Sequence, residues 1–168
     1  MVLKKKYRVY PNSFSKLDDS YSLISKYAEF DKADLENKSI DVTISGRLLT
    51  IRNMGNSSFA NLHDETGNIQ IYLQKKQVGD EAYWLFNNLD LGDIVGIKGT
   101  LFKTKTGELT INTQTIQLLS KSLRPLPEKF HGISDIEIKY RQRYLDLMIS
   151  PDTKKLFKTR TKIISSIR

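Results

Sequence analysis

The chain has no cysteine, which excludes disulfide bonds, cysteine-ligated zinc and a thiol nucleophile. It has only two histidines, His63 and His131, too few for a histidine-rich metal site. No apolar run approaches the roughly 18 residues that a membrane-spanning helix needs. The basic N-terminus is not followed by an apolar stretch, so it lacks the form of a secretory signal. We therefore expect a cytoplasmic protein without a membrane partner.

Sequence motifs for common catalytic sites are absent as well. The chain contains no G-x-x-x-x-G-K-[ST] phosphate loop, no G-x-G-x-x-G, no H-E-x-x-H and no G-x-S-x-G. Its serine, histidine and carboxylate residues form no arrangement that suggests a catalytic triad. The sequence thus predicts that this chain alone has no catalytic residue, no metal site and no cofactor.

Positive charge is in excess and unevenly spread. Lysine and arginine number 27 against 19 aspartate and glutamate, which gives a formal net charge of +8. Basic residues crowd the N-terminal segment from Lys4 to Arg8 and the C-terminal quarter from Lys139 to Arg168. This excess is typical either of a soluble surface or of a protein that binds a polyanion such as nucleic acid. Charge alone leaves both interpretations open.

The hydrophobic pattern changes along the chain and predicts its elements. Residues 1–38 comprise a basic tail, a weakly amphipathic helix over 17–30 and a polar connector over 31–38. From Ser39 apolar residues alternate with polar ones, which is typical of half-buried strands. Gly46 interrupts this alternation and predicts a bulge or a sharp bend. The expected elements that follow are strands over 39–51, 58–63, 69–73, 93–103 and 108–119, with a helix over 80–89.

The order of three strands, one helix and two strands is that of an OB-fold, an all-β barrel of five strands. Residues 39–120 are therefore predicted to form an OB-fold barrel flanked by helices at both ends, so that the whole chain is α+β. A short mixed sheet of another kind is the alternative. OB-folds commonly bind oligonucleotides on one face.

A linker and two helices are predicted after the barrel. Pro125 and Pro127 interrupt regular structure in a linker over 121–134. Ser134 and Glu137 form a capping-box pattern that predicts a helix to about residue 148, and Ser150-Pro151 opens another helix. The last helix reaches the end of the chain with an apolar side that has no partner. We expect residues 135–168 to be the truncated start of a second domain.

Strand alternation also selects a candidate binding surface. Phe59, Asn61 and His63 share one face of their strand, opposite the apolar Ala60 and Leu62. In the last strand Glu108, Thr110 and Asn112 alternate with apolar residues. By the same count, one outer surface is expected to carry Arg52, Phe59, Gln70, Glu108 and Asn112.

These residue types suit the recognition of unpaired bases. An exposed Phe59 offers a stacking face, and the Gln70 amide carries both a donor and an acceptor for a base edge. An ionised Glu108 only accepts hydrogen bonds, so it selects for donor groups, while Arg52 suits phosphate or stacking. The alternative is that Phe59 plugs one end of the barrel and the polar residues are ordinary surface.

Several strings in the chain resemble one protein family. The segments SGRLLTIRNMGNSSFANLHDETGNIQIYL, LGDIVGIKGTLFKTKTGELTI, SLRPLPEKFHG and YRQRYLDLMISPDTKKLFKTRTKIISSIR are similar to the N-terminal part of class II lysyl-tRNA synthetases. The resemblance covers about residues 39–168. The strings FKTKTGEL and RPLPEKFHG distinguish this family from the related aspartyl and asparaginyl enzymes.

This resemblance implies an anticodon-binding barrel whose partner is tRNA(Lys). In the family an arginine, a phenylalanine and a glutamine grip the central uridine, and these positions correspond to Arg52, Phe59 and Gln70. Glu108 corresponds to the acidic residue near the third anticodon base. Asn112 is assigned to the same site, at a position where bacterial enzymes of the family are expected to have histidine.

The resemblance also implies what a full-length protein does. Such an enzyme attaches lysine to tRNA(Lys) with ATP and Mg²⁺, and it is expected to be a homodimer. Residues 135–168 are then the truncated start of the class II catalytic domain. The motifs that bind ATP and lysine are expected beyond Arg168, which makes this chain non-catalytic. The alternative is a freestanding OB-type module that binds RNA or single strands without catalysis.

Overall fold

The computed structural model describes residues 7, 10–124 and 135–168. The chain divides into two compact units, Met1–Pro125 and Leu126–Arg168. Most of the predicted linker, including Pro125, Pro127 and Ser134, lies outside the described residues.

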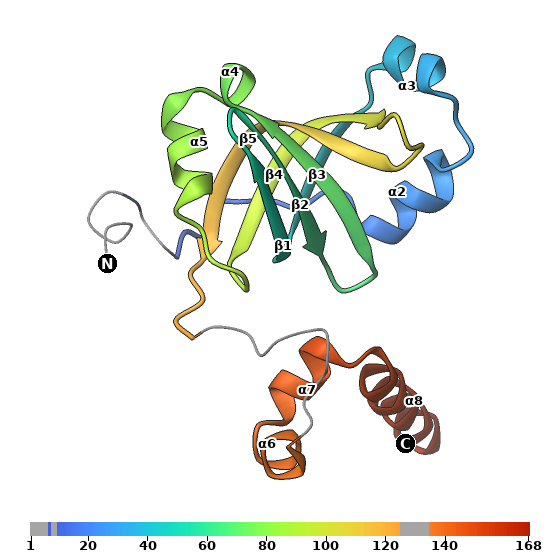
Figure 1. The fold of residues 1–168 in the computed structure, drawn as a ribbon. Helices are drawn as coiled ribbons and strands as arrows, with labels where there is room; N and C mark the ends of the chain where they lie inside the picture. Colours follow the sequence, from blue (N-terminus) through green and yellow to red (C-terminus); the bar gives the residue numbers. More distant parts are fainter. Residues whose placement is uncertain (1–6, 8–9, 125–134) are drawn as a thin grey trace. The chain divides into compact units, whose positions relative to one another are not determined.

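The first unit contains the predicted five-stranded barrel, so the OB-fold prediction is confirmed (Figure 1). The barrel closes in the order β1-β2-β3-β5-β4. All neighbouring strands are antiparallel except β3 and β5, which are parallel. The strands are β1 (Asp41–Met54), β2 (Ser57–His63), β3 (Asn68–Gln74), β4 (Ile94–Lys103) and β5 (Leu109–Ser120).

Alternation along the strands fills the barrel interior with aliphatic side chains. In β2, in β3 and in β1 as far as Leu48, every second residue is buried, as a half-exposed strand requires. Fully buried core members include Ile44, Leu62, Ile71, Ile97 and Ile111. Because each strand turns one face inward, the polar residues between these positions lie on the outside of the barrel.

The bulge predicted at Gly46 lies further along β1. The strand continues through Gly46, and its register with β2 shifts between Leu48 and Thr50. A Cβ atom at Gly46 would lie 2.7 Å from the backbone oxygen of His63, so close approach of β2 is the reason for glycine there. The shift places Arg52 opposite Phe59.

Two helices precede the barrel. The predicted helix over 17–30 is shorter, as α2 (Ser20–Tyr27). The segment predicted to be a polar connector is instead a second helix, α3 (Lys32–Lys38), and this prediction was wrong. Its single buried residue is Leu35, which is part of the barrel core cluster. One apolar anchor gives too weak a periodic signal for a helix to be recognised from sequence.

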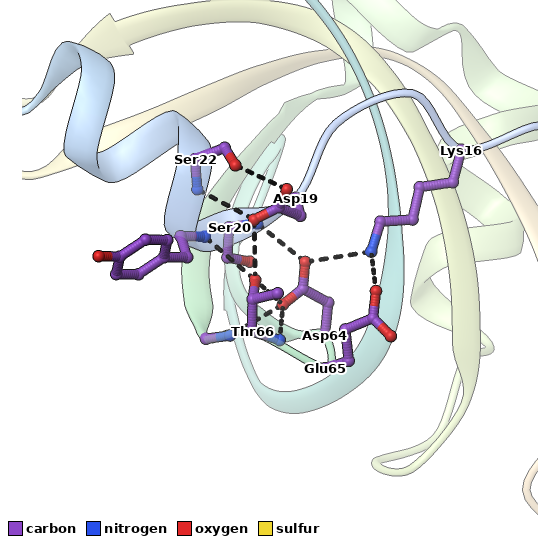
Figure 2. Close-up of polar contacts among 9 residues, drawn as sticks. Lys16, Asp19, Ser20, Ser22, Asp64, Glu65 and Thr66 are labelled. Carbon is purple, nitrogen blue, oxygen red and sulfur yellow. Dashed lines mark hydrogen bonds and ion pairs between the residues drawn. The ribbon is translucent and has the colours of Figure 1, made fainter.

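The turn between β2 and β3 is joined to α2 by a buried carboxylate, as Figure 2 shows. Asp64 accepts hydrogen bonds from the backbone N–H of Ser20 at 2.8 Å and of Gly67 at 2.9 Å. It also accepts both the N–H and the hydroxyl of Thr66 at 2.8 Å. Burial raises the pKa of Asp64, but these donors outweigh it and hold the pKa at about 2, below the usual 3.8.

Between β3 and β4 the chain forms α4 (Lys75–Val78) and α5 (Asp80–Asn87). The second of these is the helix predicted over 80–89, and its Phe86 is fully buried in the core cluster. The short α4 was not predicted.

In the second unit the described residues, 135–168, are helical, as expected, but the helix predicted to reach residue 148 is interrupted. It forms α6 (Ile136–Arg141) and α7 (Arg143–Ile149), separated at Gln142. The N-cap of α6 is Asp135, one residue after the predicted Ser134, and its side chain accepts hydrogen bonds from two backbone N–H groups. The last helix, α8 (Pro151–Ile167), begins at the predicted N-cap Ser150.

Candidate nucleic-acid interface

Strand pairing brings four side chains of the outer barrel surface into one row. Arg52 of β1 lies opposite Phe59 of β2, and Phe59 lies opposite Tyr72 of β3. Tyr72 in turn pairs with Asn112 of β5. The predicted residues Arg52, Phe59 and Asn112 thus lie in one row across neighbouring strands. Tyr72 lies between Phe59 and Asn112. We call the surface formed by this row and the next one the outer face.

The second row contains Gln70, another of the residues predicted from alternation. Gln70 of β3 lies opposite Asn61 of β2 and pairs with Thr110 of β5. Thr110 also pairs with Phe102 of β4. Glu108 stands immediately before β5 and is exposed.

Phe59 does not plug the barrel. It is half-buried, lies outside the core cluster and follows the buried Ser58 in strict alternation. Its ring centroid lies 4.6 Å from that of Tyr72, with the rings tilted by 35°. Tyr72 is in turn 5.9 Å from Phe102. The outer face therefore carries three neighbouring aromatic rings, a platform on which unpaired bases can stack.

Sequence reasoning did not select Tyr72 or Phe102. Tyr72 shares the face of Gln70, two residues earlier in the same strand, and this spacing would have identified it. Phe102 lies near the end of β4, and no spacing within that strand connects it to β3. The barrel topology brings its ring beside Tyr72.

Gln70 and Glu108 are in direct contact, although 38 positions separate them in the sequence. The Gln70 Nε2 atom donates a hydrogen bond to Glu108 Oε2 at 2.9 Å. At the other end of the amide, the Thr110 hydroxyl donates to Gln70 Oε1 at 2.9 Å. Two residues predicted to read bases independently are thus parts of one hydrogen-bonded group.

Thr110 differs from the expectation for a residue on this face, because it is fully buried. Its cross-strand neighbours Gln70 and Phe102 are both larger and flank it on the same face. A small residue between two larger ones is covered by them, and alternation within one strand does not reveal such cover.

Asn112 lines a groove of about 360 Å³ between the barrel and α3, together with Leu35, Glu36, Tyr72 and Phe102. Its Oδ1 atom is buried and accepts no hydrogen bond from the described residues. The missed helix α3 therefore forms one wall beside the outer face.

The described part of the chain shows neither a metal-binding cluster nor a membrane span. Within 7, 10–124 and 135–168, no three His, Asp or Glu side chains gather where they could hold a metal ion. No helix among these residues is long and apolar enough to cross a membrane.

Comparison with known proteins adds to this geometry. Residues 42–119 match the tRNA anti-codon family, described as an OB-fold nucleic acid binding domain. The chain is 49% identical over 155 residues to lysine-tRNA ligase from Bacillus subtilis (strain 168), covering 92% of this chain and 31% of that protein. It is 46% identical over 167 residues to lysine-tRNA ligase from Ralstonia nicotianae, covering 99% of this chain and 33% of that protein. The chain thus spans about a third of the length of these relatives.

Proposed function

Because the chain belongs to the lysine-tRNA ligase family and carries its OB-fold nucleic acid binding domain, we propose that the outer face binds the anticodon of tRNA(Lys). The observation that carries this proposal is the row of Arg52, Phe59 and Tyr72 across three strands, with Gln70 in the next row. A cation, stacking rings and an amide side by side meet the needs of single-stranded RNA recognition.

Each residue has a role that follows from its chemistry. Exposed Arg52 holds a phosphate or stacks, while Phe59 stacks on the central base of the anticodon. Gln70 reads the edge of that base, and Glu108 favours donor groups at the third base. Asn112, in the groove beside α3, contributes at the margin of the site.

The whole protein would attach lysine to tRNA(Lys) with ATP and Mg²⁺, as a cytoplasmic homodimer. This chain supplies anticodon recognition to that reaction, and we assign no catalytic step to its residues. A freestanding module that binds any single strand is the competing function.

Titration of the chain against RNA stem-loops at one fixed salt concentration tests the proposal. Replacing Phe59 by alanine is expected to weaken binding of a loop with central U by about 1–3 kcal/mol, through lost stacking. Tyr21→Ala is the matched control, since Tyr21 is a 68% exposed aromatic residue on α2 and should leave binding unchanged.

Two outcomes would contradict the proposal in different ways. Unchanged affinity after Phe59→Ala would show that the outer face is not the binding surface. Equal affinity of the wild-type chain for every loop and for an unrelated single strand would favour the freestanding module instead.

A further inference from the structure

The Gln70 amide is held at both ends, and this arrangement has consequences for which base it accepts. We propose that Glu108 and Thr110 fix the orientation of the Gln70 amide, so that the outer face accepts uracil and rejects cytosine at the position Gln70 reads. The inference rests on the proposed function and assigns to Thr110 a positioning role. It also makes Glu108 act at the central base, through Gln70.

The Glu108 end determines which way the amide points. An ionised carboxylate has acceptors only, so the amide nitrogen must face it. In the structure Gln70 Nε2 donates to Glu108 Oε2 at 2.9 Å. Rotating the amide by half a turn would bring Gln70 Oε1 against the carboxylate, where two acceptors repel each other.

The Thr110 end holds the amide oxygen. The Thr110 hydroxyl lies 2.9 Å from Gln70 Oε1 and 3.2 Å from the backbone oxygen of Glu108. It has one hydrogen to donate, and the shorter contact is to Gln70. Because Thr110 is fully buried, a side chain of the same shape without the hydroxyl leaves no room for a water at that position.

A locked amide presents a single pattern to a ligand. Among the described residues, each end of Gln70 has one contact and keeps one hydrogen-bonding position free, a donor on Nε2 and an acceptor on Oε1. Uracil offers an N3–H donor beside the O4 acceptor, which matches this pattern at two points. Cytosine has an acceptor at N3 beside an amino donor, so both contacts become repulsive. Only a rotated amide would match cytosine.

Thr110→Val tests the lock because valine keeps the shape of threonine and removes the hydroxyl. The preference for U over C at the centre of a stem-loop is expected to fall about fivefold, the effect of losing one hydrogen bond. The separate variant Thr110→Ser keeps the hydroxyl and should keep the wild-type preference for U over C. Thr113→Val is the matched control, since Thr113 is buried on the same strand and its hydroxyl has no hydrogen-bond partner among the described residues.

Glu108→Gln provides a second, isosteric test of the other end. Glutamine carries both a donor and an acceptor, so it accepts either orientation of the Gln70 amide. The variant should lower the U-over-C preference at the central base. If it relaxes discrimination at the third base alone, Glu108 acts only through the direct contact of the proposed function and the lock is wrong.

The lock also has a signature in the free chain. In NMR relaxation experiments the Gln70 side-chain amide, assigned from its absence in Gln70→Ala, should be rigid in wild type and mobile in Thr110→Val. An amide equally rigid in both, or a full U-over-C preference in folded Thr110→Val, would overturn the inference. A wild-type chain that binds RNA without any central preference would instead refute the proposed function, whatever the state of the amide.

Discussion

The carboxylate of Asp64 joins α2 to the turn between the two strands that carry Phe59 and Gln70, and its removal should destabilise the barrel. Asp64→Asn keeps the size of the side chain but replaces one acceptor oxygen by an amino group. The amide nitrogen accepts no hydrogen bond, so if the amide keeps its oxygen at the Oδ1 position for Thr66 and Gly67, the backbone N–H of Ser20, which donates to Oδ2, loses its acceptor.

The pKa of Asp64 gives the magnitude. A fall from 3.8 to about 2 on folding means that the ionised carboxylate stabilises the folded state by about 2 kcal/mol near neutral pH. Because the folded pKa is the lower one, this contribution is complete above pH 3.8 and is lost as the pH falls towards 2. The asparagine variant has no such titration.

Urea unfolding at a series of pH values, followed by the fluorescence of Trp84, measures this difference. Trp84 is the only tryptophan and lies on α5, within the barrel unit. The free energy of unfolding of wild type should exceed that of Asp64→Asn by about 2 kcal/mol at pH 6, and the gap should close towards pH 2. Glu65→Gln, one position further along and exposed, is the control and should change stability by less than about 0.5 kcal/mol. A gap that stays constant with pH would refute the argument, since the ionised carboxylate would then not be its cause.

Two further predictions concern buried contacts of the barrel. Lys121→Met should cost about 3–5 kcal/mol of unfolding free energy, because it leaves the fully buried Asp93 without its ion-pair partner; adding Asp93→Asn should recover part of the loss in the same urea assay. Gly99→Ala should destabilise the barrel by at least about 1–3 kcal/mol, because a Cβ atom there would lie 2.1 Å from the backbone oxygen of Asn112. Gly67→Ala is the control, because its added Cβ would contact the Ser20 side chain at an ordinary 3.6 Å, and it should leave the thermal unfolding temperature unchanged. Equal losses of stability in the two alanine variants would refute the steric explanation.

Alternation of apolar and polar residues is enough to predict the strands of the barrel. The predicted strands over 58–63 and 69–73 differ from β2 and β3 by only one residue at any end. The reason is physical: a strand with one buried face must repeat every two residues, and a slip of one residue would expose its whole apolar set. The same rule placed Phe59 and Gln70 on the outside of the barrel.

The helices that the sequence did not predict correctly are those whose formation depends on packing against the rest of the chain. The segment over 31–38 is polar, and its helix α3 is anchored on the barrel core through Leu35 alone. The break at Gln142 between α6 and α7 likewise contains no proline or glycine from which it could be predicted. Local sequence carries little signal in such places because the stabilising contacts come from elsewhere in the chain.

The candidate site likewise has a part that the sequence predicts and a part that only the tertiary structure reveals. Its individual residues, Arg52, Phe59 and Gln70, could be identified from spacing within single strands. The contacts among them could not, because the parallel pairing of β3 with β5 joins residues some 40 positions apart. That pairing buries Thr110 beside Gln70 and brings Glu108 to the amide nitrogen. Sequence spacing thus determined which side chains face outward, whereas strand pairing alone decided which of them touch.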